Sequence, residues 1–186
     1  MSLQAVLDEM EEKMMKTLEV VHNECSTVRT GKASPALVDN IDVEAYGATM
    51  KLKQLALIST PEPRLLVISP FDASTTQAIE KAIKESKLGI TPSVDGKIIR
   101  LPIPALSEER RRDLVKTLKQ IAEETRVRIR SSRRDGMDAL KKAQKEGHIT
   151  EDALGAYEKD VQKLTDDYVK KVDDALTAKE ADIMKV

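Results

Sequence analysis

Three stretches of this chain repeat apolar residues at helical spacing over lengths that leave few folds open. The first, Leu3–Val28, follows the i, i+3, i+4, i+7 rule closely. The second runs from Ser107 to about Glu146 and the third from Thr150 to Ile183. The second helix would be about 60 Å long and needs apolar partners along its whole length. Because the other two can supply them, the pattern predicts an elongated antiparallel three-helix bundle.

Residues suited to helix ends stand where these stretches begin and stop. Ser107 and Thr150 are plausible N-caps, and the two glutamates after Ser107 favour the start of a helix. Gly147 lies between the second and third helices as a short turn requires. Gly31 is expected to close the first helix in a left-handed conformation.

Residues 31–106 have a different pattern. Alternating or short buried-type apolar runs predict strands at 41–46, 49–55 and 65–68, and Asp95-Gly96 predicts a hairpin turn between two more. Helical spacing returns between Asp72 and Lys87, and five of the seven prolines fall in this region. We therefore predict an α+β protein in which a small β/α/β domain, residues 31–104, is inserted into a bundle formed by residues 1–30 and 105–186.

The chain crosses between these two predicted domains twice, at 29–35 and at 103–107. Two short, adjacent connections make a hinge, and mobility about so small a junction is the default expectation. The predicted hinge residues are Gly31, Pro35, Pro104 and Ala105.

Positive charge is concentrated in one segment of the second helix. Residues 110–134 hold ten Lys or Arg against three acidic residues, in a chain whose formal net charge is −1. At 100° per residue, seven of these cations share an arc of about 100°, separate from the apolar arc. We call them the cationic stripe: Arg112, Lys116, Lys119, Arg126, Arg130, Arg133 and Arg134.

Two kinds of anionic partner could neutralise the cationic stripe, and the sequence does not decide between them. Only Glu123 lies among the seven cations, and like charges at i,i+4 repel, so something anionic should neutralise the stripe. Acidic residues of the other helices, such as Glu11, Glu12, Asp166 and Asp173, could do so. Nucleic acid is the favoured alternative. With no Trp and one Phe, the contact should be electrostatic and shape-directed.

Other kinds of site find little support. His22 and Cys25 are three residues apart, but nothing nearby completes a metal site. Gly31-Lys32 lacks the rest of a phosphate-binding loop, and no nucleophile or acid–base motif is present. We therefore expect no enzymatic activity, catalytic residue, cofactor or metal. One cysteine allows no internal disulfide, and the absence of a long apolar run or a signal peptide predicts a cytoplasmic protein without membrane contact.

Several motifs in order resemble the ribosome recycling factor family over about residues 3–185. They are Arg29–Pro35, Ser69–Asp72, Asp95-Gly96, Pro102–Pro104 running into Glu108–Arg111, Arg133–Asp135 and Gln162–Asp166.

The resemblance implies an L-shaped monomer that binds the large ribosomal subunit of the post-termination complex. With elongation factor G and GTP, it would split the subunits and release mRNA and tRNA. It also implies that Arg130 and Arg133 contact ribosomal RNA, with Arg126, Arg112 and Arg29 as further contacts.

Three positions depart from the family pattern. Lys32 stands where Arg is usual, Ser131 where Asn is frequent, and Gly136 where Ala is common. A glycine inside a helix should cost about 1 kcal/mol. An adaptor that binds an acidic protein surface is the alternative function, and an RNA-processing enzyme is a more distant one.

Overall fold

The computed structural model describes residues 2–185, which form two compact units. The first comprises the chain up to Cys25 and Val115–Ala181, and the second comprises Ser26–Leu114 with the residues from Asp182 on. The elements in chain order are α1 (Leu3–Ser26), η1 (Pro35–Leu37), β1 (Asp42–Ala45), β2 (Ala48–Lys51), α2 (Leu52–Leu55), β3 (Ala56–Glu62), β4 (Leu65–Pro70), η2 (Ala73–Thr75), α3 (Thr76–Glu85), β5 (Ser93–Asp95), β6 (Ile98–Pro102), α4 (Glu108–Lys145) and α5 (Glu151–Met184).

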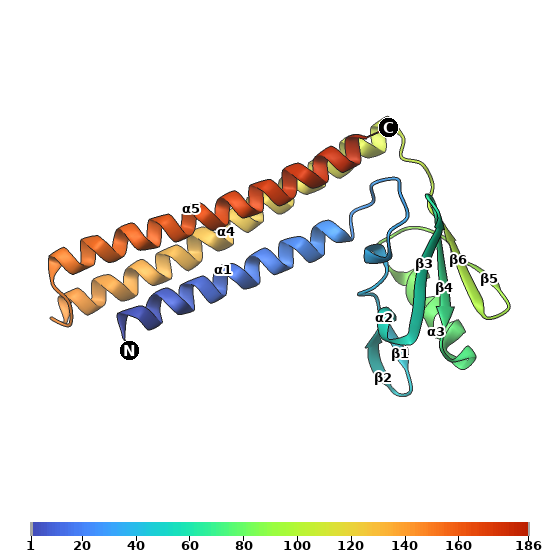
Figure 1. The fold of residues 1–186 in the computed structure, drawn as a ribbon, viewed down its shortest axis with the longest axis horizontal. Coiled ribbons are helices and arrows are strands. Elements are labelled where there is room, and N and C mark those ends of the chain that lie inside the picture. Colours follow the sequence, from blue (N-terminus) through green and yellow to red (C-terminus); the bar gives the residue numbers. More distant parts are fainter. Residues whose placement is uncertain (1, 186) are drawn as a thin grey trace. The chain divides into compact units, whose positions relative to one another are not determined.

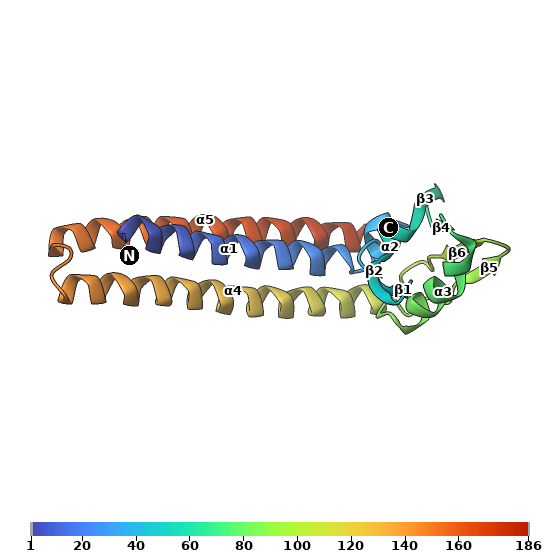
Figure 2. The same ribbon diagram turned by 90° about the horizontal axis from the view of Figure 1, so that it is seen from below.

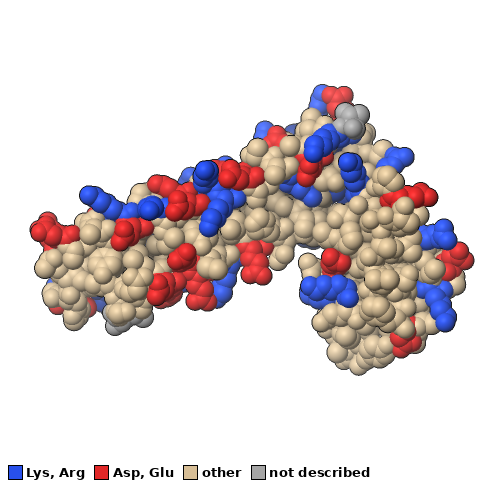
Figure 3. Space-filling model, in the orientation of Figure 1, with Lys and Arg blue, Asp and Glu red and all other residues tan. Residues whose placement is uncertain are grey.

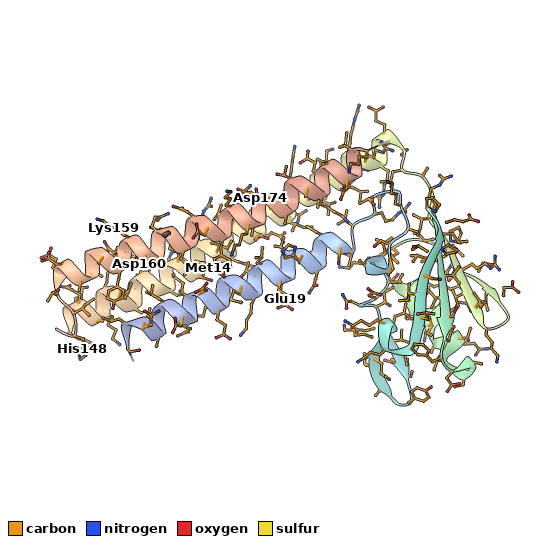
Figure 4. The ribbon with its side chains drawn as sticks, viewed as in Figure 1. Met14, Glu19, His148, Lys159, Asp160 and Asp174 are labelled. Atoms are coloured by element: carbon orange, nitrogen blue, oxygen red, sulfur yellow. The ribbon has the colours of Figure 1, made fainter. Side chains whose placement is uncertain are left out.

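The first unit is a bundle of the three long helices, as the apolar periodicity predicts. Helices α1, α4 and α5 lie side by side, and α4 runs opposite to the other two (Figures 1 and 2). Met14 lies between the helices and is fully buried (Figure 4). Each such buried side chain stabilises the fold by about 1.5–3 kcal/mol. Other core residues of this unit are Met10, Val21, Leu118, Ile129, Leu140, Val161, Val172 and Leu176.

The predicted helix ends are confirmed for α4 and α5. The Ser107 hydroxyl accepts a hydrogen bond from the Arg110 amide at 3.1 Å, and Thr150 does the same for Ala153 at 3.1 Å. Gly147, at φ +76°, ends α4. The amides of residues 147 and 148 donate to carbonyls of the last helical turn at 3.0 and 2.9 Å, in a Schellman motif.

The end of α1 differs from the prediction. Gly31 has the expected left-handed backbone, at φ +81°, but α1 already stops at Ser26. Gly31 therefore shapes the connection after the helix and does not cap it.

The second unit is built on antiparallel strands. Strands β3, β4, β6 and β5 form a four-stranded sheet in that order, and β1 and β2 form a separate hairpin. The register sets Ile68 opposite Ile99 and Leu66 opposite Leu101, so the fully buried side chains of β4 and β6 share one face. Helix α3 contributes Ile79 to the same core.

The predicted strand at 49–55 is wrong in its second half. Strand β2 ends at Lys51, and Leu52–Leu55 form the helical turn α2. The Gln54 side chain accepts a hydrogen bond from the Lys51 amide at 3.0 Å, and the amide of Leu52 donates to the carbonyl of Ile41 at 2.9 Å. These bonds satisfy the backbone in a turn and end the alternation. Strand β3 follows at once and was not predicted.

Candidate nucleic-acid interface

The cationic stripe lies on one side of α4 and the packing residues lie on another. Leu114, Leu118, Thr125 and Ile129 are buried, as the separate apolar arc predicts. All members of the stripe are exposed except Arg126, which is half-buried. One helix therefore holds the bundle together and offers cations to solvent.

Four members of the stripe have no acidic partner within the described residues. No carboxylate of residues 2–185 lies within 4.0 Å of the side-chain nitrogens of Lys116, Lys119, Arg133 or Arg134. Their charge is compensated only by solvent and salt, so these four side chains are the ones best placed to bind an anionic partner.

The other three members are partly neutralised by the protein's own carboxylates. Arg126 Nη2 lies 2.9 Å from Asp173 Oδ1 on α5 and Nη1 lies 3.6 Å from Glu123. Arg130 is 3.8 Å from Glu123, and Arg112 pairs with Glu108 one turn earlier. Glu123 therefore neutralises part of the stripe, Asp173 adds a pair from α5 as the sequence allowed, and Glu108 adds a pair that was not predicted. The i,i+4 spacing of Glu108 and Arg112 was the available signal for one missed pair.

Of the four acidic residues proposed as intramolecular covers, only Asp173 has an ion pair with the stripe. Glu11 accepts a hydrogen bond from the Tyr168 hydroxyl at 3.2 Å, Glu12 pairs with Lys16 at 2.7 Å, and Asp166 accepts from Gln162. Intramolecular neutralisation thus reaches part of the stripe and leaves most of its charge available.

Charge elsewhere is arranged differently. In the face drawn in Figure 3, acidic side chains follow the edge formed by α1, and both signs are scattered over the sheet unit. The concentrated positive charge of α4 is therefore a local property of that helix. An anionic partner would be attracted to the positively charged segment 110–134 of α4 more than to the acidic edge formed by α1.

Arg29 lies apart from the stripe, in the connection that follows α1. Its Nη2 donates to the Pro104 carbonyl oxygen at 3.2 Å. Burial, and then the nearby charge of Arg110, lower the pKa of Arg29 from its ordinary value. The other four predicted RNA-binding arginines therefore lie on α4, whereas Arg29 lies outside that helix but near the charge of Arg110 in its first turn.

The other features considered from the sequence are a metal site, a reactive cysteine and a membrane span. Residues 2–185 contain no group of three or more His, Cys, Asp or Glu side chains placed to hold a metal. His22 is exposed, whereas Cys25 is buried and its pKa is raised by that burial. No helix of the described chain has the length and apolar character of a membrane span.

Gly136 is explained by close helix packing. A Cβ built on Gly136 would lie 2.8 Å from the sulfur of Met10 on α1. These two residues border a groove of about 240 Å³ between α1 and α4, which Val6 and Ala139 also line. The lower helix propensity of glycine is therefore offset by the close packing of the Met10 side chain against Gly136.

The fold defines a class of α+β protein in which a helical bundle with a cation-bearing face is joined to a small antiparallel sheet. The comparisons with known proteins narrow this class. The family model described as "Ribosome recycling factor" matches residues 21–184. The chain belongs to the ribosome recycling factor family.

Three similar proteins span essentially the whole chain. The ribosome-recycling factor of Akkermansia muciniphila is 54% identical over 188 residues and covers 100% of both chains. A solution structure of a ribosome recycling factor has a TM-score of 0.82 at 41% identity, covering 100% of this chain and 99% of the other. A third match has a TM-score of 0.69 at 43% identity and covers 100% of both chains. It is described as part of models for the T. thermophilus ribosome recycling factor and E. coli elongation factor G bound to the E. coli post-termination complex.

Proposed function

We propose that this chain recycles ribosomes after translation termination, acting with elongation factor G on the post-termination complex. Family membership over nearly the whole chain is the observation that carries this proposal. The chain is a translation factor. GTP would be hydrolysed by the elongation factor, and this chain would contribute binding and leverage without enzymatic chemistry of its own.

The cationic stripe is the proposed contact with RNA of the large ribosomal subunit. Arg133 supports this best, because it is exposed and has no acidic neighbour within 4.0 Å among residues 2–185. Arg130 is 64% exposed and only loosely paired with Glu123. Arg112 and Arg126 would have to exchange a carboxylate for a phosphate, and so should contribute less.

The two connections at 29–35 and 103–107 are the proposed hinge. On this view residues 1–30 and 105–186 act as one body and residues 31–104 as another. The bundle docks on RNA, and the elongation factor moves the inserted domain as a lever. Gly31 supports the proposal because its left-handed φ of +81° allows a backbone path that other residues rarely adopt.

A subunit-splitting assay tests the function. Post-termination ribosomes are mixed with the protein, elongation factor G and GTP, and subunits are separated by sedimentation. We expect splitting with the native protein and a marked loss with Arg133→Gln. Arg128→Gln is the matched control, since Arg128 is an exposed arginine of α4 outside the stripe.

The outcomes separate the parts of the proposal. No splitting by the native protein would refute the function. Equal loss with both variants would instead refute the role of the stripe. Binding to both ribosomal subunits without preference would favour an adaptor of acidic surfaces.

A further inference from the structure

The two connections are held together at the edge of the sheet. The amide of Ala33 donates to the Pro63 carbonyl, and the amide of Ile103 donates to the Arg64 carbonyl, both at 2.7 Å. Pro63 and Arg64 are consecutive residues in the turn between β3 and β4. The incoming and outgoing chains are therefore tied to the same turn.

A second tie lies just beyond the first. Arg29 Nη2 donates to the Pro104 carbonyl oxygen at 3.2 Å, which joins positions 75 residues apart in sequence. A Cβ added at Gly31 would lie 3.7 Å from the Leu106 side chain, so the two connections run close together there. The Arg29 bond is the one side-chain tie among these contacts, and a ligand could compete for it.

The Arg29 guanidinium is poorly satisfied in this arrangement. Its Nε is buried and has no hydrogen-bond partner. Its acceptor is a neutral carbonyl, and no carboxylate of residues 2–185 lies within 4.0 Å of it. Burial and the charge of Arg110 disfavour the cation, which lowers its pKa. An unpaired, partly desolvated guanidinium gains more from a phosphate than from a carbonyl, because charge-assisted bonds are about twice as strong and can be bidentate.

We propose that Arg29 is an RNA-sensitive latch between the two connections. In the unbound protein it holds the Pro104 carbonyl. When an RNA phosphate reaches the guanidinium, its Nη groups bind the phosphate and Pro104 is released. The connections then loosen only after docking. This inference rests on the proposed function, since it requires that the protein binds RNA.

Nuclear magnetic resonance of the full chain can follow both halves of the exchange. The Nε–H signal of Arg29 reports on phosphate. Hydrogen exchange at the amides of Ala33 and Ile103, which donate to the Pro63 and Arg64 carbonyls, reports on the two connections. The probe is an RNA duplex whose length just exceeds that of α4, and it is added at low salt. We expect the Arg29 signal to shift and the two amides to exchange faster as the duplex is added.

Variants separate the latch from general effects of charge. Arg29→Gln should raise exchange at the amides of Ala33 and Ile103 about fivefold in the unbound protein, the factor for one lost hydrogen bond, and RNA should add nothing more. Arg29→Lys keeps the charge but lacks the two planar Nη groups, so it should weaken the response. Arg64→Gln removes an exposed arginine whose side chain makes neither tie, and should behave as the native protein.

Three results would overturn the latch. If the Arg133 signal moves with RNA and that of Arg29 does not, no phosphate reaches Arg29, while the proposed docking stands. If the Arg29 signal moves and the amides of Ala33 and Ile103 keep their exchange rates, the bond is not a latch. If neither arginine responds, docking through the stripe fails and the latch fails with it.

Discussion

Replacing Asp173 with Asn should strengthen RNA binding, although Asp173 lies on α5 and outside the cationic stripe. Its Oδ1 holds Arg126 Nη2 at 2.9 Å and competes with any phosphate for that guanidinium. Asp173→Asn removes this competing carboxylate, so the Arg126 guanidinium becomes available to bind an RNA phosphate. A residue that never touches RNA would then limit the affinity.

The size of the expected gain in affinity follows from the solvent exposure of the Arg126 and Asp173 side chains. The side chains of Arg126 and Asp173 are 36% and 43% exposed, so their pair is worth only about 0.2–1 kcal/mol. RNA no longer has to break this pair in the variant, which predicts an affinity gain of up to about fivefold. One additional phosphate contact should also steepen the slope of log affinity against log salt by about 0.7–0.9.

Fluorescence titration with large ribosomal subunits at several salt concentrations measures both quantities. Asp174, which is labelled on α5 in Figure 4, provides the matched control. Asp174→Asn changes the net charge equally while Arg126 stays paired with Asp173. Its effect should be small and should leave the slope unchanged. Equal gains in the two variants would refute the reasoning, as would weaker binding by Asp173→Asn with an intact fold.

Two further predictions concern stability. Gly155→Ala should raise the free energy of unfolding by about 1 kcal/mol. Gly136→Ala should raise it less, because the new Cβ would displace the Met10 sulfur. Urea unfolding compares the two variants, and equal gains in stability would contradict the packing argument. The Tyr46 hydroxyl donates to Asp72 at 2.6 Å and is the main cause of that carboxyl's lowered pKa. Such stabilisation is present above the ordinary Asp pKa and is lost as pH falls through the lowered one. Tyr46→Phe should therefore destabilise the protein at neutral pH and have little effect in strong acid, and a deficit independent of pH would count against this.

The helices could be predicted from sequence because their signals are local. Apolar spacing continues for dozens of residues in α4, and its boundaries carry their own chemistry in Ser107 and Gly147. The turn α2 could not be predicted in this way. Its four residues are too few for periodicity, and its conformation depends on a hydrogen bond between the Leu52 amide and the Ile41 carbonyl.

The candidate site was predictable in position but not in its pairing. Helical geometry places the seven cations on one side of α4 without any tertiary information. The pairs that Glu108 and Glu123 make are local to α4, but the pair between Arg126 and Asp173 depends on how α5 is rotated against α4. Asp173 lies 47 residues from Arg126 in sequence, and nothing local distinguishes it from Asp166. The latch bond between Arg29 and Pro104 is equally non-local.

Lysine footprinting on the large ribosomal subunit tests the central claim most directly. The unmodified protein is acetylated with and without the subunit, and each lysine is quantified by mass spectrometry. Lys116 and Lys119 are exposed members of the stripe, whereas Lys159 and Lys170 are exposed on α5. Docking through the stripe predicts strong protection of the first two and little protection of the second two. Full reactivity at Lys116 and Lys119 in the bound state would contradict it.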